Sequence, residues 1–419
     1  MFMKEYANPF EFQENDPIIA CVGDNGGTDN EVIKSGFQRT ANILIELSSN
    51  YNETEDTLVY PLVYNARHSF ELALKIIIEQ LWELQKLKGI VKSDEIIKEE
   101  KKKIHCHDIK TLFEMVESLA KVDRRLPSCY KGIEPLVEFY YFDKDGDAFK
   151  YEKDVHEVPH MIHNKISHIC INTFGEQFND IMGKLDKMID FLENCIREYQ
   201  LHTFTKNLSR EDIENVSRSL PKYEKWGEDQ FIEIREEVKR KYNISNREFS
   251  KVLDIIKGHR KFCVNIGLEN TYREISEEEF EAYAVMVHQA IIERQHEEEE
   301  NYDLWSLSNT PMASQEQRNY DVEIQISTLN LLLAFSEMSN TELEAENLEQ
   351  IFEYHSKSAY SKDYLIRKLR SEQFCKKIIV GLRKCGQLSY ENRLLNSLRN
   401  QGINVQIQET VDGIYIKFN

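Results

Sequence analysis

One helical stretch near residue 70 is apolar on almost every side and yet carries four polar or charged residues. At about 100° per residue, residues 64–82 place Arg67, His68, Glu71 and Lys75 within roughly 100° of arc. The remaining surface of this helix is covered by large apolar side chains, namely Phe70, Leu72, Leu74, Ile76, Ile77, Ile78, Leu81 and Trp82. A helix that is apolar on most sides is usually buried, and buried charges are costly unless they are paired or used. The rest of the chain therefore has to fold around this helix, and its charged cluster is the strongest site candidate.

The same four residues have a second interpretation as a solvent-exposed face. Glu79 extends their arc, and Arg67 and Glu71 stand at the i,i+4 spacing that surface ion pairs use. The two interpretations differ in burial. If the cluster is buried, we expect Arg67 and Glu71 to pair and to be covered by Trp82 or by a later helix over residues 173–200.

Composition favours a mainly helical, cytoplasmic protein. The 419 residues include only 16 glycines and 8 prolines, fewer than a turn-rich β fold uses. With 41% hydrophobic residues, the chain has enough apolar side chains for two or three domain cores. No apolar run approaches the length of a membrane span, and the first residues lack the layout of a signal peptide. The eight cysteines are scattered without a Cys-x-x-Cys pair, so we expect free thiols and no membrane contact.

The pattern of apolar residues and loop signals predicts three domains. Residues 1–204 read as a helical domain, residues 205–300 as a middle helical domain, and residues 301–319 as a solvated linker. Residues 320–419 read as a C-terminal helical domain that ends in a β-hairpin.

Two short β elements are also expected inside the first domain. Aromatic residues flank an Asp-Gly turn in residues 139–151, which is typical of a β-hairpin. Residues 165–171 could add another strand.

The order of motifs in residues 35–200 resembles HEPN-like helical domains. The motifs are Arg67-His68-x-x-Glu71-Leu-x-Leu-Lys75, His107-Asp108-Ile and Asp147-x-Phe149-Lys150-Tyr151. In that family, a first helix of this kind precedes a His-Asp-Leu helix start and an aromatic-Arg-Tyr-Pro segment. Here Lys150 replaces the arginine and Glu152 replaces the proline. Residues 209–419 are similar to a helical module of uncharacterised bacterial proteins, on motifs that lie between Leu208 and Gly267, and this similarity adds no activity.

The resemblance implies an RNA-directed effector of bacterial phage-defence or toxin type. Many HEPN proteins are metal-independent endoribonucleases with an Arg-x(4–6)-His motif duplicated across a homodimer. Arg197 and His202 give the only match to that motif, and chance alone yields on the order of one or two such matches. His163 and His168 resemble it more closely in character, with a histidine where the family has arginine. The resemblance therefore implies RNA as a partner, a homodimer and no cofactor.

If the protein cleaves RNA, the candidate catalytic residues are Arg67, His68, Glu71, Lys75 and His168. His68 or His168 would act as the general base, because histidine titrates near neutrality, and Arg67 or Lys75 would steady the phosphate. The alternative is a non-catalytic regulatory or scaffold protein whose HEPN-like domain binds a protein or RNA partner. A cluster exposed in a cleft would favour the first hypothesis, and a cluster closed by mutual ion pairs would favour the second.

A basic segment near the C-terminus is the candidate nucleic-acid-binding surface. The chain has a net charge of −20, which opposes non-specific binding to nucleic acid. Residues 357–399 nevertheless hold eleven basic and three acidic side chains. The basic side of this amphipathic segment comprises Arg367, Lys368, Lys376, Lys377, Arg383 and Lys384. We expect these six residues to contact RNA or an acidic partner, if they are not simply solvated.

Neither the histidines nor the acidic turn predicts a metal site. Eight of the 12 histidines precede residue 203, but they lack the tight ligand spacing of zinc sites. Residues 143–147 imitate the start of a calcium loop, yet the glycine comes too early and the twelfth position is Asp154. We therefore expect a turn there and no bound metal.

Overall fold

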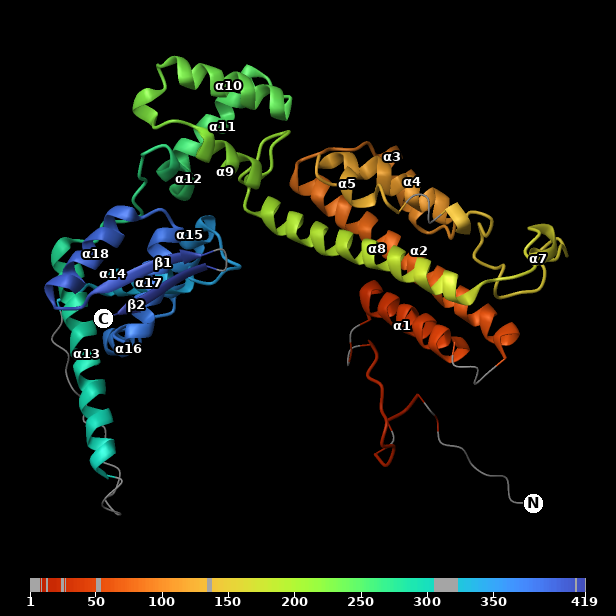
Figure 1. The fold of residues 1–419 in the computed structure, drawn as a ribbon, viewed down its shortest axis with the longest axis horizontal. Helices are drawn as coiled ribbons and strands as arrows, with labels where there is room; N and C mark the ends of the chain where they lie inside the picture. The colour runs from red at the N-terminus through yellow and green to blue at the C-terminus, as the bar shows by residue number, and fades with distance from the viewer. Residues whose placement is uncertain are drawn as a thin grey trace. The chain divides into compact units, whose positions relative to one another are not determined.

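The computed structural model is mainly helical and ends in a small hairpin, as the composition and pattern predicted (Figure 1). It describes Asn8, Gly26 and residues 10–12, 14–23, 28–49, 54–133, 138–304, 323–410 and 413–418. For Ser49, Phe139, residues 296–304 and Gly413 it describes the backbone alone. The chain divides into two compact units, Met1–Gln200 and Leu201–Asn419, and each is described by itself.

The first unit is built around the long apolar helix. Its helices are α1 (Asn30–Ser49), α2 (Glu55–Leu87), α3 (Asp94–Ile104), α4 (Ile109–Leu119), α5 (Pro127–Tyr130), α7 (His160–His163) and α8 (Ile171–Gln200), with 3-10 turns η2 (Ala120–Val122) and η3 (Glu138–Tyr140). α2 packs against α1, α4 and α8, and Figure 1 shows α2 and α8 side by side. Because α2 is apolar nearly all round, it can be covered from several sides at once.

Local sequence signals account for where several of these helices begin and which face they bury. Ser93 and Asp108 accept backbone hydrogen bonds at the starts of α3 and α4. α8 buries one stripe at helical spacing, which includes Phe178, Leu185 and Leu192. The helix predicted over residues 173–200 is therefore confirmed.

The two β elements predicted inside the first domain are wrong. Within the described residues, the segment 138–151 forms η3 and a series of turns, and residues 165–170 form a loop before α8 begins. The sequence also predicts a helix over residues 132–139, of which residues 134–137 lie outside the described part of the chain.

Tertiary contacts explain why the aromatic segment does not form a hairpin. The Oδ1 atom of Asp143 accepts hydrogen bonds from the backbone N–H of Asp147 at 2.9 Å and of Ala148 at 3.1 Å. These bonds close a tight loop in which Gly146 has a φ of +71°. Phe149 packs into an apolar cluster with α2 residues, so no partner strand is needed to bury it.

The second unit contains two hydrophobic cores. Its elements are α9 (Arg210–Ser219), η4 (Tyr223–Lys225), α10 (Asp229–Tyr242), α11 (Asn246–Gly258), α12 (Arg260–Asn265), α13 (Glu277–Leu304), α14 (Ile326–Glu337), η5 (Ala345–Asn347), α15 (Leu348–Lys357), α16 (Lys362–Leu369), α17 (Glu372–Lys384), α18 (Leu388–Asn400), β1 (Val405–Thr410) and β2 (Gly413–Phe418). Helices α9 to α12 share one core. Helices α13 to α18 share the other, in which α14 is buried almost all round and packs on α15, α16 and α17.

The predicted terminal hairpin is confirmed. β1 and β2 pair antiparallel, with a register that runs from Val405 opposite Phe418 to Thr410 opposite Gly413. The expected linker starts inside α13, which is helical to Leu304, and residues 305–319 lie outside the described part of the chain. The division of residues 205–419 into two domains therefore stays a prediction.

Candidate functional site

Arg67 is buried on α2 and its nitrogen atoms are held by three neighbours. Its side chain is only 4% exposed. Nη1 donates to Glu71 Oε2 at 3.3 Å, and Nη2 donates to the carbonyl oxygens of His107 at 2.6 Å and Asp143 at 2.7 Å. Nε lies 3.0 Å from Asp143 Oδ2, which is close enough for an ion pair although the N–H is not aligned for a hydrogen bond.

Glu71 completes the cluster from one helical turn further along. Its Oε1 atom lies 2.9 Å from both Lys75 Nζ and His107 Nδ1, and its side chain is 2% exposed. Burial by itself would raise the pKa of Glu71, but the hydrogen bonds and charges of Lys75 and His107 outweigh it and hold the pKa below its ordinary value. Glu71 is therefore an anion at neutral pH.

The predicted pairing and burial of Arg67 and Glu71 are confirmed. Their further polar partners are His107, at the start of α4, and the loop at Asp143. Coverage of the pair by Trp82 or by the 173–200 helix stays a prediction. Mutual ion pairs and carbonyl acceptors thus close the cluster, which is the arrangement that a structural network would have.

His68 faces a different environment from its neighbour Arg67. Its ring meets Phe37 edge-on at 4.4 Å between centroids and stacks on Tyr64 at 5.9 Å. Burial is the main cause that lowers the pKa of His68, with smaller contributions from nearby cations that include Lys150. The imidazole is therefore neutral at neutral pH.

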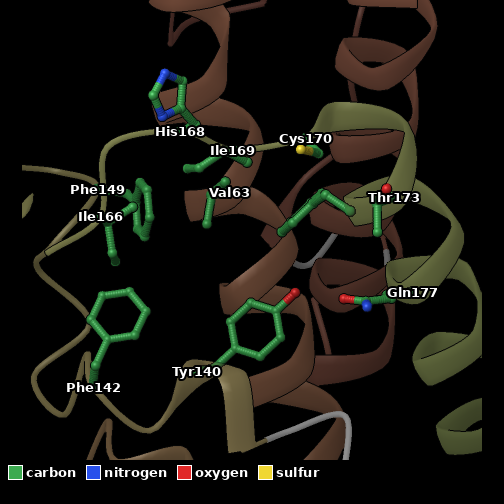
Figure 2. Close-up of a pocket in the computed structure, with 11 residues that line it drawn as sticks. Val63, Tyr140, Phe142, Phe149, Ile166, His168, Ile169, Cys170, Thr173 and Gln177 are labelled. Carbon is green, nitrogen blue, oxygen red and sulfur yellow. The ribbon is translucent and has the colours of Figure 1, made fainter. Parts of the chain in front are cut away.

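His168 lies in the exposed loop that leads into α8. Its Nδ1 atom is 2.9 Å from the hydroxyl of Ser167. Figure 2 shows His168 at the edge of a pocket that is otherwise lined mostly by apolar and aromatic side chains. No contact joins His168 to the Arg67–Glu71 cluster among the described residues.

The remaining near-matches to the ribonuclease motif do not form a pair either. Arg197 is largely exposed and pairs with Glu193 at 3.4 Å on α8, whereas His202 follows the helix with a φ of +57°. His163 ends the short α7 and is exposed.

The six basic residues of the C-terminal segment lie on two separate helices, and several are already bound. Arg383 pairs with the buried Glu391 and with Glu409, each at 2.6 Å, and Lys384 donates to the carbonyl of Asn340 at 2.6 Å. Of the other four, Arg367 and Lys368 lie on α16, and Lys376 and Lys377 lie on α17. Lys376 pairs with Glu372. Arg367 and Lys377 are exposed, so the surface open to a partner is smaller than the sequence indicated.

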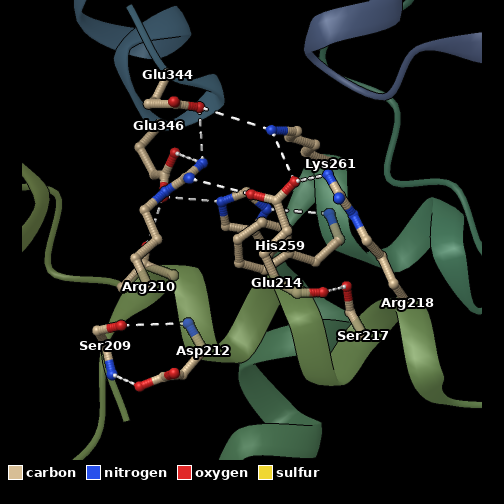
Figure 3. A network of polar contacts seen from close by, with 12 residues as sticks. Ser209, Arg210, Asp212, Glu214, Ser217, Arg218, His259, Lys261, Glu344 and Glu346 are labelled. Carbon is tan, nitrogen blue, oxygen red and sulfur yellow. Dashed lines mark hydrogen bonds and ion pairs between the residues drawn. The ribbon is translucent and has the colours of Figure 1, made fainter. Parts of the chain in front are cut away.

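A second charged cluster, in the second unit, was missed by sequence reasoning (Figure 3). Arg210 is buried at the start of α9, where its Nε lies 2.7 Å from Glu346 and its Nη2 lies 2.9 Å from Glu344. Lys261 on α12 lies 3.0 Å from Glu214. The i,i+4 spacing of Arg210, Glu214 and Arg218 was the only signal in the sequence, because the partners near residue 345 are more than a hundred residues away.

His259 joins this cluster to the start of α12. Its Nδ1 atom accepts the backbone N–H of Phe262 at 3.2 Å, so a neutral ring carries its proton on Nε2. That Nε2 atom lies 2.9 Å from Glu346 Oε1. The hydrogen bonds and charges of His259 and Arg210 hold the pKa of Glu346 far below its ordinary value, against the opposing effect of burial.

Comparisons with known protein families, curated proteins and solved structures give no significant match to this chain. The described residues contain no group of three or more histidine, cysteine or acidic side chains placed to hold a metal ion. No helix in the described part of the chain is long and apolar enough to cross a membrane.

Proposed function

We propose that this protein is a non-catalytic regulatory or scaffold protein whose HEPN-like first unit binds a protein partner. The closure of the Arg67–Glu71 cluster is the observation that supports this proposal. A ribonuclease site needs a cation that is free to hold a phosphate, and a base beside it. The polar atoms of Arg67 instead contact Glu71, Asp143 and the carbonyl oxygen of His107, which precedes α4. The residue as a whole is only 3% exposed.

The charge distribution favours a protein partner over RNA. Counterion release on phosphate binding requires cations that are free in the unbound protein. In the basic segment, Arg383 is bound to two glutamates and Lys376 to one. The net charge of −20 adds a general repulsion toward nucleic acid.

The second hypothesis is an RNA-directed effector of phage-defence or toxin type that cleaves RNA without a metal. One observation favours it: burial lowers the pKa of His68, which leaves a free lone pair at neutral pH, as a general base requires. In this hypothesis His68 or His168 takes the proton of the 2′-hydroxyl, and the product carries a 2′,3′-cyclic phosphate. Arg67 or Lys75, of which Lys75 is partly exposed, would then steady the phosphate.

Incubation of the purified full-length protein with total RNA, with and without chelator, separates the two hypotheses. We expect no cleavage, no cyclic phosphate ends and no growth arrest on expression. The matched variant carries His68→Ala and His168→Ala, with its melting temperature measured alongside. Cleavage by the wild type that this variant loses would overturn our proposal in favour of the effector, and cleavage that both retain would place a catalytic site elsewhere.

A further inference from the structure

The first unit contains a pocket that the charged clusters do not use. It has a volume of about 320 Å³, at the lower end of the range for ligand pockets, roughly 300–1,000 Å³. Its apolar wall comprises Val63, Phe142, Phe149, Ile166, Ile169 and Phe174. Figure 2 shows Val63, Phe142, Phe149, Ile166 and Ile169 arranged around a central space between α2, the loop after η3 and the start of α8.

Tyr140 places an unpartnered hydroxyl at the floor of this pocket. The residue is 6% exposed and lines the pocket, and among the described residues its hydroxyl has no hydrogen bond. Burial raises the pKa of Tyr140, so the phenol stays protonated, and its oxygen can donate one hydrogen bond and accept another. A hydroxyl that faces a pocket and is bound by no protein group is available to a ligand.

Two more polar groups converge on the same space. Figure 2 shows the hydroxyl of Tyr140 and the side-chain amide of Gln177 turned toward one another across the pocket, with Thr173 one turn away on α8. Gln177 also has no hydrogen-bond partner among the described residues. An N–H group placed between them could donate to the phenol oxygen of Tyr140 or to the amide oxygen of Gln177.

The lining also defines the charge that a ligand can carry. None of the described residues that line the pocket is Asp, Glu, Lys or Arg. A charged ligand would lose its hydration without gaining an opposite charge. The pocket therefore suits a neutral molecule.

The aromatic walls favour a flat ligand. Phe142 and Phe149 meet at 6.2 Å with their planes 70° apart, and Tyr140 meets Phe174 at 6.4 Å and 68°. Rings at these angles present both faces and edges, with which another aromatic ring packs well. We propose that this pocket binds a small neutral aromatic molecule with a single hydrogen-bonding group, of the size of indole, held at that group by Tyr140 and Gln177.

Titration of the full-length protein with indole, followed by calorimetry, tests this inference. Indene has the same shape but no N–H group, and indole-2-carboxylate adds a charge. We expect saturable binding of indole, weaker binding of indene and no binding of the carboxylate. The loss of one hydrogen bond should weaken indole binding about two- to tenfold in Tyr140→Phe, and it should leave indene binding unchanged.

Two further variants keep the test decisive. Tyr151→Phe removes a hydroxyl from an exposed tyrosine of the same unit and should bind indole like the wild type. Thr173→Trp changes an exposed residue at the rim, so it should fold and should block the pocket. No saturable binding of indole to the wild type, or equal affinity in wild type, Tyr140→Phe and Thr173→Trp, would overturn the inference.

Discussion

At the scale of single residues, Arg67 shows how a guanidinium can be kept inside an apolar core. The burial of a lone cation lowers the free energy of unfolding by several kcal/mol, and this loss is smaller only when acceptors bind its N–H donors. The acceptors here come from three places in the sequence: Glu71 on the same helix, the carbonyl of His107 and the loop at Asp143. The cluster fixes the position of that loop and the start of α4 relative to α2.

Removal of Glu71 should therefore be costly. Glu71→Ala leaves Lys75 without its carboxylate and leaves Arg67 with Asp143 as its remaining carboxylate, and we expect the free energy of unfolding to fall by about 3–5 kcal/mol in urea titrations. Glu79→Ala is the matched control, because Glu79 lies on the exposed part of the same helix and should change stability by less than about 0.5 kcal/mol. Equal stability of the two variants would mean that the cluster is solvated.

Gly146 provides a second test of the same cluster. A Cβ atom there would lie 2.7 Å from Arg67 Nη1, in addition to the strain of a φ of +71°. Gly89 has a similar φ of +67° with nothing within 4 Å, so Gly89→Ala measures the backbone strain alone. We expect Gly146→Ala to lower the free energy of unfolding more than Gly89→Ala does, by a difference of about 1–2 kcal/mol. An equal cost would show that Arg67 is not fixed where the structure has it.

At the scale of elements, the basic side chains of the amphipathic helix α17 have different roles. Lys377 and Arg383 both lie outside the apolar stripe, but only Lys377 is exposed. Arg383 instead neutralises Glu391, which is 3% exposed on α18. Charges that look equivalent along the sequence thus differ in what they contact.

Charge reversal should separate these roles. Arg383→Glu places a third carboxylate beside Glu391 and Glu409 and should destabilise the protein by about 2–4 kcal/mol, whereas Lys377→Glu should change stability by less than about 0.5 kcal/mol. Any RNA binding should weaken steeply with salt and should fall in an Arg367→Glu, Lys377→Glu double variant that remains folded. RNA affinity unaffected by that double variant would rule out this surface.

At the scale of the whole molecule, the charged cluster of the second unit joins its two hydrophobic cores. Arg210 and Lys261 belong to helices of one core, and Glu344 and Glu346 precede α15 of the other. The contact between the two cores therefore depends on carboxylates that must stay ionised.

This dependence predicts how the free energy of unfolding decreases at acid pH. The pKa values of Glu214 and Glu346 lie below their ordinary value of 4.5 in the folded protein, because Arg210, Lys261 and His259 favour the anions. A lowered folded pKa stabilises the fold above about pH 4.5, and that stabilisation is lost progressively as the pH falls below it. We expect Glu346→Gln to be less stable than the wild type at pH 7 and to lose less stability between pH 5 and pH 3.

The fluorescence of Trp226 reports on the second unit in a background of Trp82→Phe and Trp305→Phe. Glu342→Gln serves as the control, because Glu342 is exposed and next to the same segment. Parallel acid profiles for Glu346→Gln and Glu342→Gln would contradict the predicted role of the cluster.

The helices, their caps and the final hairpin follow from local sequence patterns, because the signals for these elements act over a few residues. Apolar spacing placed α2 and α8, and Ser and Asp caps marked the starts of several helices. Alternation over residues 403–418 predicted β1 and β2. The i,i+4 spacing was likewise enough to predict that Arg67 pairs with Glu71.

Tertiary contacts determine which of the local signals produce the expected secondary structure and which charged side chains come into contact. An Asp-Gly pair occurs at residues 145–146 and again at 412–413, yet only the second lies between two paired strands. The first lies in a loop that the side chain of Asp143 closes and that Arg67 anchors from 76 positions away. Two partners of Arg210, Glu344 and Glu346, are 134 and 136 positions away. Burial sets the cost of an unpaired charge, and it is the packing of distant segments that determines which groups are buried together.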